Sequence, residues 1–88
     1  MRYEVVIKKK VLKGLRKLPL GIQKKFAVLA KDLQEQGPEQ PTWQNYGKLS
    51  PTEYHCHLRT SWVACWRHKK PTIIIEVYYV GSREKAPY

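Results

Sequence analysis

The chain has 88 residues, which is enough for one small domain with a single modest core. Hydrophobic residues make up 42% of it and aromatic residues 11%, a composition that excludes a disordered chain. The formal net charge is +10, from 17 Lys and Arg against 7 Asp and Glu. Such an excess indicates a polyanionic partner: a nucleic acid, an acidic protein or an anionic membrane.

The positive charge is concentrated near the N-terminus. Residues 1–31 hold ten Lys or Arg and one acidic residue, Glu4, whereas residues 32–88 hold seven basic and six acidic residues. The start of the chain lacks the apolar region of a signal peptide, and no stretch approaches the ~20 apolar residues of a membrane span. We therefore expect a soluble, cytoplasmic protein. Cys56 and Cys65 have neither CxxC nor zinc-site spacing and are expected to be buried thiols.

The first half of the chain predicts one strand and two helices. Polar residues alternate with Val and Ile over residues 3–7, which predicts a short strand. Leucines at helical spacing predict a basic helix over residues 10–18, which Pro19 interrupts. Over residues 20–36 the apolar side chains recur at i, i+4, i+7 and i+11, as on one face of an amphipathic helix. That stripe consists of Ile22, Phe26, Leu29 and Leu33.

After Gly37 and Pro38 the hydrophobic period changes from 3.6 to 2. A short strand is predicted over residues 43–49, and three core strands are predicted at 54–58, 62–67 and 72–80. The order of one strand, two helices and then several strands predicts a single α+β domain over residues 1–88. In it, the N-terminal strand and the two helices pack on a mostly antiparallel sheet.

The register of the hairpin around Thr60 decides which side chains share a face. A two-residue loop at Thr60 and Ser61 would place large tryptophans on the face of the histidines. A three-residue loop over residues 59–61 collects the large apolar side chains on one face, so we predict that register. It pairs Leu58 with Trp62, Cys56 with Ala64 and Tyr54 with Trp66. The opposite face then carries His55, His57, Val63, Cys65 and Arg67, and the two cysteines point away from each other.

His55 and His57 are the first candidates for chemistry. Residues two apart on a strand project from the same face, and two imidazoles can supply a base and an acid near neutral pH. The alternative is a pair of surface histidines without a role. A zinc site is not expected, because Cys56 points to the other face and no second ligand pair is suitably spaced.

Further basic and aromatic residues are candidates for binding RNA. An arginine fork can hold a phosphate and stabilise the charge that develops on phosphorus during cleavage. Ordinary surface charge and ordinary core packing are the alternatives for these residues. The candidates for phosphate are Lys48, Arg59, Arg67 and Arg83, and those for stacking on bases are Trp43, Tyr46 and Tyr78. The terminal Tyr88 either frays or folds back into a groove.

Short motifs along the second half combine in a recognisable order. They are Lys48-Leu49, Tyr54 with Leu58-Arg59, the aromatic strand 62–66, residues 73–77, and Val80-Gly81-Ser82-Arg83 followed by Tyr88. With the preceding strand and two basic helices, the chain resembles the RelE/ParE superfamily of toxins from bacterial type II toxin–antitoxin systems. The resemblance covers essentially the whole chain and is to the RelE-like branch.

That resemblance implies a ribosome-dependent mRNA endonuclease, in which the 2′-hydroxyl of the mRNA attacks the adjacent phosphate without a metal or other cofactor. It also implies a cognate antitoxin as a partner, besides mRNA on the ribosome and ribosomal RNA. Two alternating family lysines correspond to His55 and His57, the arginine after the last strand to Arg83, and the tail tyrosine to Tyr88. These four are the expected catalytic residues. Lys48, Arg59 and Arg67 are the expected RNA-binding residues.

One departure from the family leaves other functions open. Val63 stands where the family often has an arginine, and either Arg67 or Arg59 would have to replace that phosphate contact. A ParE-like inhibitor of DNA gyrase, with no chemistry of its own, is therefore the alternative within the superfamily. A non-catalytic nucleic-acid-binding regulator with the same fold is the alternative outside it.

Overall fold

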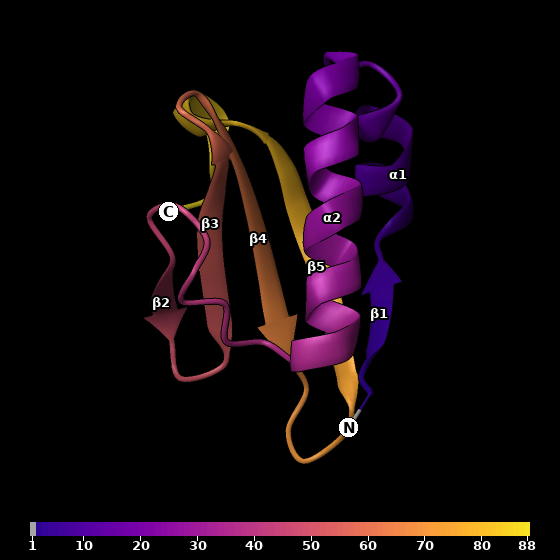
Figure 1. Cartoon of the computed structure of the whole chain (residues 1–88), viewed down its shortest axis with the longest axis vertical. Coiled ribbons are helices and arrows are strands. Elements are labelled where there is room, and N and C mark those ends of the chain that lie inside the picture. The colour runs from indigo at the N-terminus through magenta and orange to yellow at the C-terminus, as the bar shows by residue number, and fades with distance from the viewer. Residues whose placement is uncertain (1) are drawn as a thin grey trace.

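The computed structural model describes residues 2–88 and consists of a five-stranded sheet with helices packed against it (Figure 1). The strands follow the order β1-β5-β4-β3-β2 across the sheet, and only β1 and β5 are parallel. This arrangement confirms the predicted α+β class with a mostly antiparallel sheet. The elements in chain order are β1 (Glu4–Ile7), α1 (Lys9–Leu15), α2 (Leu20–Gln36), β2 (Gly47–Ser50), β3 (Glu53–Arg59), β4 (Trp62–His68), β5 (Ile74–Ser82) and a 3₁₀ turn, η1 (Arg83–Lys85).

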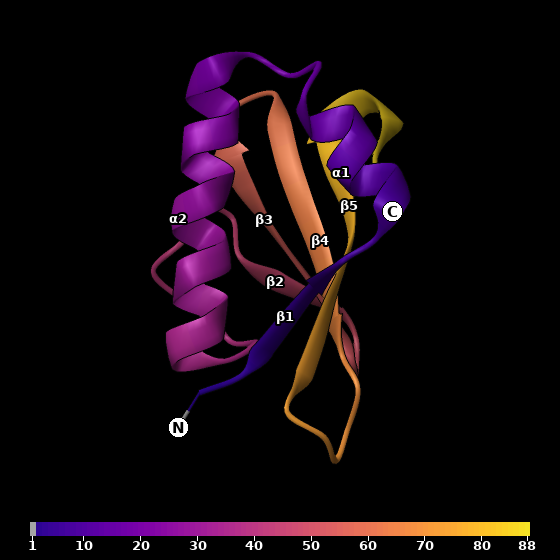
Figure 2. The ribbon, with the colours of Figure 1, turned by 90° about the vertical axis from the view of Figure 1, so that its right-hand side faces the viewer.

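Helix α2 covers one face of the sheet, and its predicted apolar stripe is the buried one. It ends at Gly37, whose φ of 95° is a conformation that glycine adopts without a Cβ clash and whose N–H donates to the Leu33 carbonyl. Helix α1 lies beside β5, past the end of β1 (Figure 2). It is shorter than predicted, because Lys17 and Leu18 donate to the carbonyls three residues back and form tight turns before Pro19.

Three aromatic rings form the part of the core nearest the end of α2. Tyr46, Tyr54 and Trp66 are stacked, with ring centroids 6.1–6.4 Å apart. Trp66 and Tyr54 are fully buried, and the indole Nε1–H of Trp66 donates to the Pro38 carbonyl at 2.9 Å. This bond satisfies a buried indole and a buried carbonyl at once, and it fastens the loop after α2 to β4.

Two of the predicted strands differ from their predicted bounds by more than one residue at an end. The strand predicted over residues 43–49 begins only at Gly47, because the preceding residues form turns. Asn45 has a φ of 52° there, and the N–H of Tyr46 donates back to the Trp43 carbonyl. The last strand runs over Ile74–Ser82 rather than 72–80, because Thr72 closes a turn with the Lys69 carbonyl.

The hairpin around Thr60 combines features of both registers that were considered. Cys56 lies opposite Ala64 and Tyr54 opposite Trp66, as predicted. The three-residue loop is wrong: the turn has two residues, Arg59 pairs with Trp62, and a bulge between His57 and Arg59 absorbs the extra residue. A bulge lets two residues oppose one and turns the following side chain to the other face. Arg59 thereby leaves the face of the histidines.

Strand β4 is buried on both faces, although only one of them was expected to be core. Val63 and Cys65 point away from α2, yet both are fully buried, as are Ala64 and Trp66 on the α2 side. Cys56 and Cys65 are free thiols on opposite faces, and burial raises the pKa of each to about 12. Within residues 2–88, neither helix is long and apolar enough to cross a membrane.

Candidate active site

The four residues predicted to be catalytic converge on the face of the sheet away from α2. His55 and His57 project from β3, and β4 separates them from the end of β5 through the pairs His57–Val63 and Val63–Gly81. Arg83 follows β5 directly, and the tail then returns across the sheet. The ring centroids of His55 and Tyr88 lie 4.7 Å apart. Figure 2 shows the C-terminus on the side of the sheet opposite α2.

His57 is held more tightly than a surface histidine. Only 7% of it is exposed, and its backbone N–H donates to the Gln44 carbonyl at 2.8 Å. Its ring Nδ1 lies 3.3 Å from the side-chain amide of Asn45. An asparagine amide offers both donors and an acceptor, so this contact orients the ring with either tautomer. Sequence reasoning missed Asn45, although asparagine is among the residues that most readily adopt the left-handed conformation it has here, with a φ of 52°.

The protonation states suit proton transfer at neutral pH. Burial, and next the charge of Arg83, lower the pKa of His57, while burial and then His57 lower the pKa of His55. Both imidazoles are therefore mainly neutral at pH 7 and able to accept a proton. Burial raises the pKa of the Tyr88 phenol, which keeps its proton. The cluster thus presents neutral bases, a hydroxyl donor and the permanent cation of Arg83.

The His57 titration provides a direct check of this geometry. In NMR titrations, we expect both His55 and His57 to titrate below the ordinary value of 6.5. Arg83→Gln should raise the pKa of His57 and leave that of His55 nearly unchanged, since Arg83 is not among the causes of its shift. A His57 pKa that does not respond to Arg83→Gln would place the two groups far apart.

The same shifts predict the direction of the stability change with pH. A histidine with a lowered folded-state pKa binds its proton more readily in the unfolded chain. Both histidines therefore make the free energy of unfolding fall as the pH drops below ~6.5 towards their folded-state values. Urea denaturation at several pH values measures this, and the double variant His55→Gln/His57→Gln should weaken the dependence.

Two of the three predicted RNA-binding residues lie on the α2 side of the sheet. Lys48 pairs with Tyr54, and its Nζ lies 5.5 Å from the centre of that ring. Arg59 lies beside Gly21, near the start of α2, in a hollow that it shares with Trp62. Neither residue joins the histidines.

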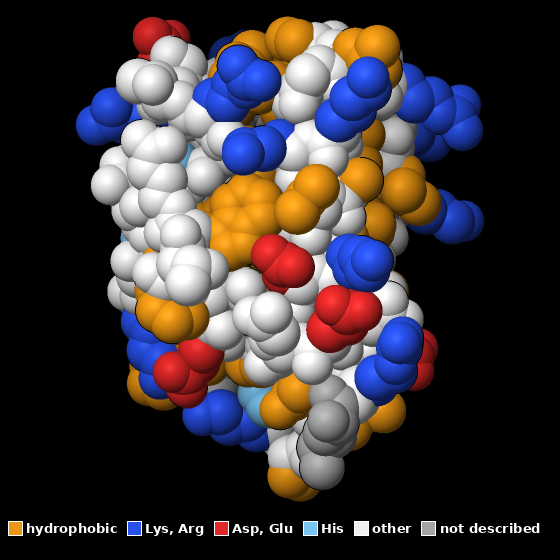
Figure 3. Space-filling view, in the orientation of Figure 1, with side chains coloured by type: hydrophobic (Ala, Val, Ile, Leu, Met, Phe, Trp, Pro, Cys, Tyr) orange, Lys and Arg blue, Asp and Glu red, His pale blue; other side chains and the backbone are white. Residues whose placement is uncertain are grey.

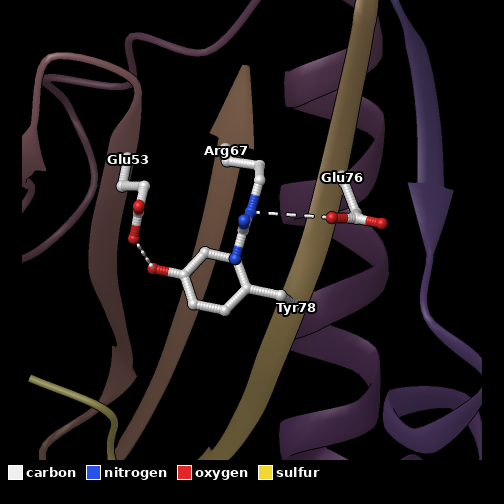
Figure 4. Close-up of polar contacts among 4 residues, drawn as sticks. All are labelled: Glu53, Arg67, Glu76 and Tyr78. Carbon is white, nitrogen blue, oxygen red and sulfur yellow. Dashed lines mark hydrogen bonds and ion pairs between the residues drawn. The ribbon is translucent and has the colours of Figure 1, made fainter. Parts of the chain in front are cut away.

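Arg67 is engaged in an internal polar cluster (Figure 4). Its Nε lies 3.6 Å from a carboxylate oxygen of Glu76, and its guanidinium carbon lies 4.4 Å from the centre of the Tyr78 ring. The Tyr78 hydroxyl donates to Glu53, which pairs with Arg67 across the strands. Four residues along β4 separate Arg67 from Val63, a distance of roughly 13 Å. Arg67 therefore does not lie close to Val63, the position at which the resemblance to RelE-like toxins led us to expect an arginine.

Arg83 is thus the one predicted phosphate contact that lies with the histidines. Val63 is fully buried between His57 and Gly81, so this position contributes an apolar side chain to the site and no positive charge. Among residues 2–88, no three His, Cys, Asp or Glu side chains gather as a metal ion would require. The candidate active site is therefore defined by His55, His57, Arg83 and Tyr88, with Asn45 as a positioning residue for His57.

Several solved structures share the fold. The RelE–RelB complex of Pyrococcus horikoshii contains a chain with a TM-score of 0.77 and 19% identity, covering 98% of this chain and 100% of that one. The isolated RelE toxin of E. coli gives a TM-score of 0.72 and 21% identity, with 97% and 88% covered. The YoeB dimer of Staphylococcus aureus gives 0.72 and 13%, with 94% and 99% covered. These similarities confirm the predicted RelE-like fold. No protein-family model and no curated protein sequence matches the chain.

Proposed function

We propose that the protein is the toxin of a toxin–antitoxin system and that it cleaves mRNA on the ribosome. The observation that carries the proposal is the convergence of His55, His57, Arg83 and Tyr88 at one end of the sheet, from residues far apart in the sequence. The fold, shared with RelE and YoeB toxins, supports it.

Cleavage by such a group is an internal transfer at phosphorus. His57, neutral at pH 7, removes the proton from a 2′-hydroxyl, whose oxygen then bonds to the adjacent phosphorus. The bond from phosphorus to the 5′-oxygen breaks, and that oxygen takes up a proton from the solvent, to which His57 then releases the proton that it accepted. The products are a 2′,3′-cyclic phosphate and a 5′-hydroxyl. Arg83 stabilises the additional negative charge on the phosphoryl oxygens, and Tyr88, which retains its proton, donates a hydrogen bond there.

The proposed partners follow from charge and from the related complexes. The basic residues before position 32 suit ribosomal RNA, and they also suit an acidic segment of an antitoxin. The fold neighbours include toxins in complex with RelB and YefM, which supports a cognate antitoxin for this chain as well. The proposal places the protein in the cytoplasm, where mRNA and ribosomes are found.

Induced expression tests the proposal. We expect growth arrest, with transcripts cut inside ribosome-covered regions and with 5′-hydroxyl ends at the cuts. Purified protein added to mRNA-programmed ribosomes should reproduce the cuts with no divalent metal other than the Mg²⁺ that the ribosomes themselves require. Growth arrest with intact transcripts would contradict the nuclease function.

Inhibition of DNA gyrase is the second candidate, and one observation favours it. Lys48, Arg59 and Arg67 all lie away from the histidines, so the candidate active site has Arg83 as its predicted phosphate contact and a buried Val63 beside it. A binding module needs no such contacts. Trapped gyrase–DNA complexes in arrested cells, together with intact mRNA, would identify this function.

A further inference from the structure

A groove borders His57 on the side facing α2. It has a volume of about 350 Å³ and is lined from α2, from the loop before β2 and from β3. The lining residues are Lys25, Val28, Thr42, Trp43, Gln44, His57 and Leu58. Because His57 belongs both to the groove and to the candidate active site, a ligand in the groove lies next to this residue, on the side of β3 opposite to Arg83.

Trp43 forms a fixed aromatic wall of this groove. Its indole Nε1–H donates to the Asp32 carboxylate at 2.9 Å, which fastens the ring to α2. The ring packs partly on the core and remains half-buried. The other two aromatic candidates for base stacking are engaged elsewhere, since Tyr46 stacks on Tyr54 in the core and Tyr78 bonds to Glu53. Trp43 is therefore the candidate for stacking that has free space beside it.

A cation accompanies this aromatic wall. The Lys25 Nζ lies 5.8 Å from the centre of the Trp43 ring, and no carboxylate forms an ion pair with Lys25 among the described residues. Figure 3 shows an apolar surface at the centre of the view, with Lys and Arg side chains above it and Asp and Glu side chains below it. An aromatic plane beside a lysine is the arrangement that binds a base together with its phosphate in single-stranded nucleic acids.

We propose that this groove is the binding site for a nucleotide next to the scissile phosphate, with its base stacked on Trp43 and its phosphate held by Lys25. The inference rests on the proposed function, because it takes single-stranded RNA as the ligand. Arg59 and Arg67 were expected to bind RNA but lie away from His57. In the proposal, Lys25 and Trp43 make the RNA contacts beside His57 instead. The scissile phosphate then lies on the far side of His57, towards Arg83.

Binding of a short 2′-O-methyl oligoribonucleotide tests the groove separately from cleavage, because this RNA has no free 2′-hydroxyl to attack. We expect Trp43→Leu to weaken binding roughly tenfold or more and Trp43→Phe to retain most of it, because the phenyl ring still stacks. Lys25→Ala should weaken binding. It should also reduce the slope of log affinity against log salt concentration by about one, the amount expected for one lost phosphate contact. Lys24→Ala removes the same charge from the neighbouring exposed position outside the groove and is the matched control.

The outcomes separate the two proposals. If wild-type protein does not bind the oligonucleotide, or if Trp43→Leu binds as well as wild type, the groove is not an RNA site, whatever the protein cleaves. If binding depends on Trp43 and Lys25 but mRNA on the ribosome stays intact, the proposed nuclease function is wrong, and the groove is still an RNA-binding site. If Trp43→Leu abolishes binding of a purified antitoxin but leaves binding of the oligonucleotide unchanged, the groove belongs to a protein partner and the inference is overturned. Thermal unfolding confirms that each variant is folded.

Discussion

Replacing His57 or Arg83 with alanine is expected to slow RNA cleavage by roughly 10²–10⁴-fold in each case. His57→Ala removes the proposed base, and Arg83→Ala removes the cation proposed to stabilise charge on the phosphoryl oxygens. Because both act in one step, the double variant should lose less than the product of the two single effects. Single-turnover cleavage on mRNA-programmed ribosomes measures the rates, and induced expression should no longer arrest growth.

His68→Gln is the matched control for His57. His68 lies at the other end of β4, where its Nε2 contacts the Thr72 carbonyl at 2.8 Å, so its loss should leave cleavage unchanged. Lys70→Ala is the corresponding control for Arg83, because it removes a positive charge from an exposed turn. If the controls and the site variants reduce cleavage alike, the effect comes from net charge or folding, and the roles assigned to His57 and Arg83 are wrong.

Trp66→Ala is expected to lower the free energy of unfolding by about 3–5 kcal/mol. The side chain is fully buried, stacks on Tyr46 and Tyr54, and donates its indole N–H to Pro38. Its removal leaves a cavity and an unpaired carbonyl in the same place. Small domains have only ~5–15 kcal/mol in total, so this loss removes a large fraction of the stability and the variant should unfold at a much lower urea concentration. Urea denaturation followed by circular dichroism measures the loss.

Trp66→Phe separates the cavity from the hydrogen bond. It retains an aromatic ring but leaves the Pro38 carbonyl without its donor, for which we expect a loss of about 1–3 kcal/mol. Leu12→Ala provides the surface comparison, since 47% of Leu12 is exposed, and its effect should be smaller than that of either Trp66 variant. A Trp66→Ala variant as stable as Leu12→Ala would mean that the aromatic stack is not part of the core.

Periodicity was sufficient to predict the helix stripe and the core face of the hairpin. The stripe that begins at Ile22 is buried as expected, and Tyr54 and Cys56 meet Trp66 and Ala64. Periodicity could not predict the bulge before Arg59, because a bulge changes the face of a side chain without changing the apolar pattern. It also assigned residues 43–46 to a strand, since the turn there depends on Asn45 adopting a positive φ rather than on hydrophobicity.

The candidate active site was predictable to a different extent for each residue. The spacing of His55 and His57 fixed their common face, and the family resemblance suggested Arg83 and Tyr88. Lys48, Arg59 and Arg67 were expected to bind RNA because they are positively charged. Their charge does not indicate which side chains of the folded protein they contact. Arg67 could be placed only once Glu76 and Tyr78 were seen beside it. Asn45 and Lys25 likewise depend on contacts between segments distant in the sequence.

The parallel pairing of β1 with β5 has a consequence for synthesis of the protein. Glu4 lies opposite Ile74, and β5 lies between β1 and β4, so the sheet stays divided until the last strand has been made. Contacts that join the two ends of a chain form late, because closing a long loop costs conformational entropy. Arg83 and Tyr88 come later still. A nascent chain therefore has no complete group of site residues, and the proposed nuclease activity would be absent while the ribosome is still translating the chain.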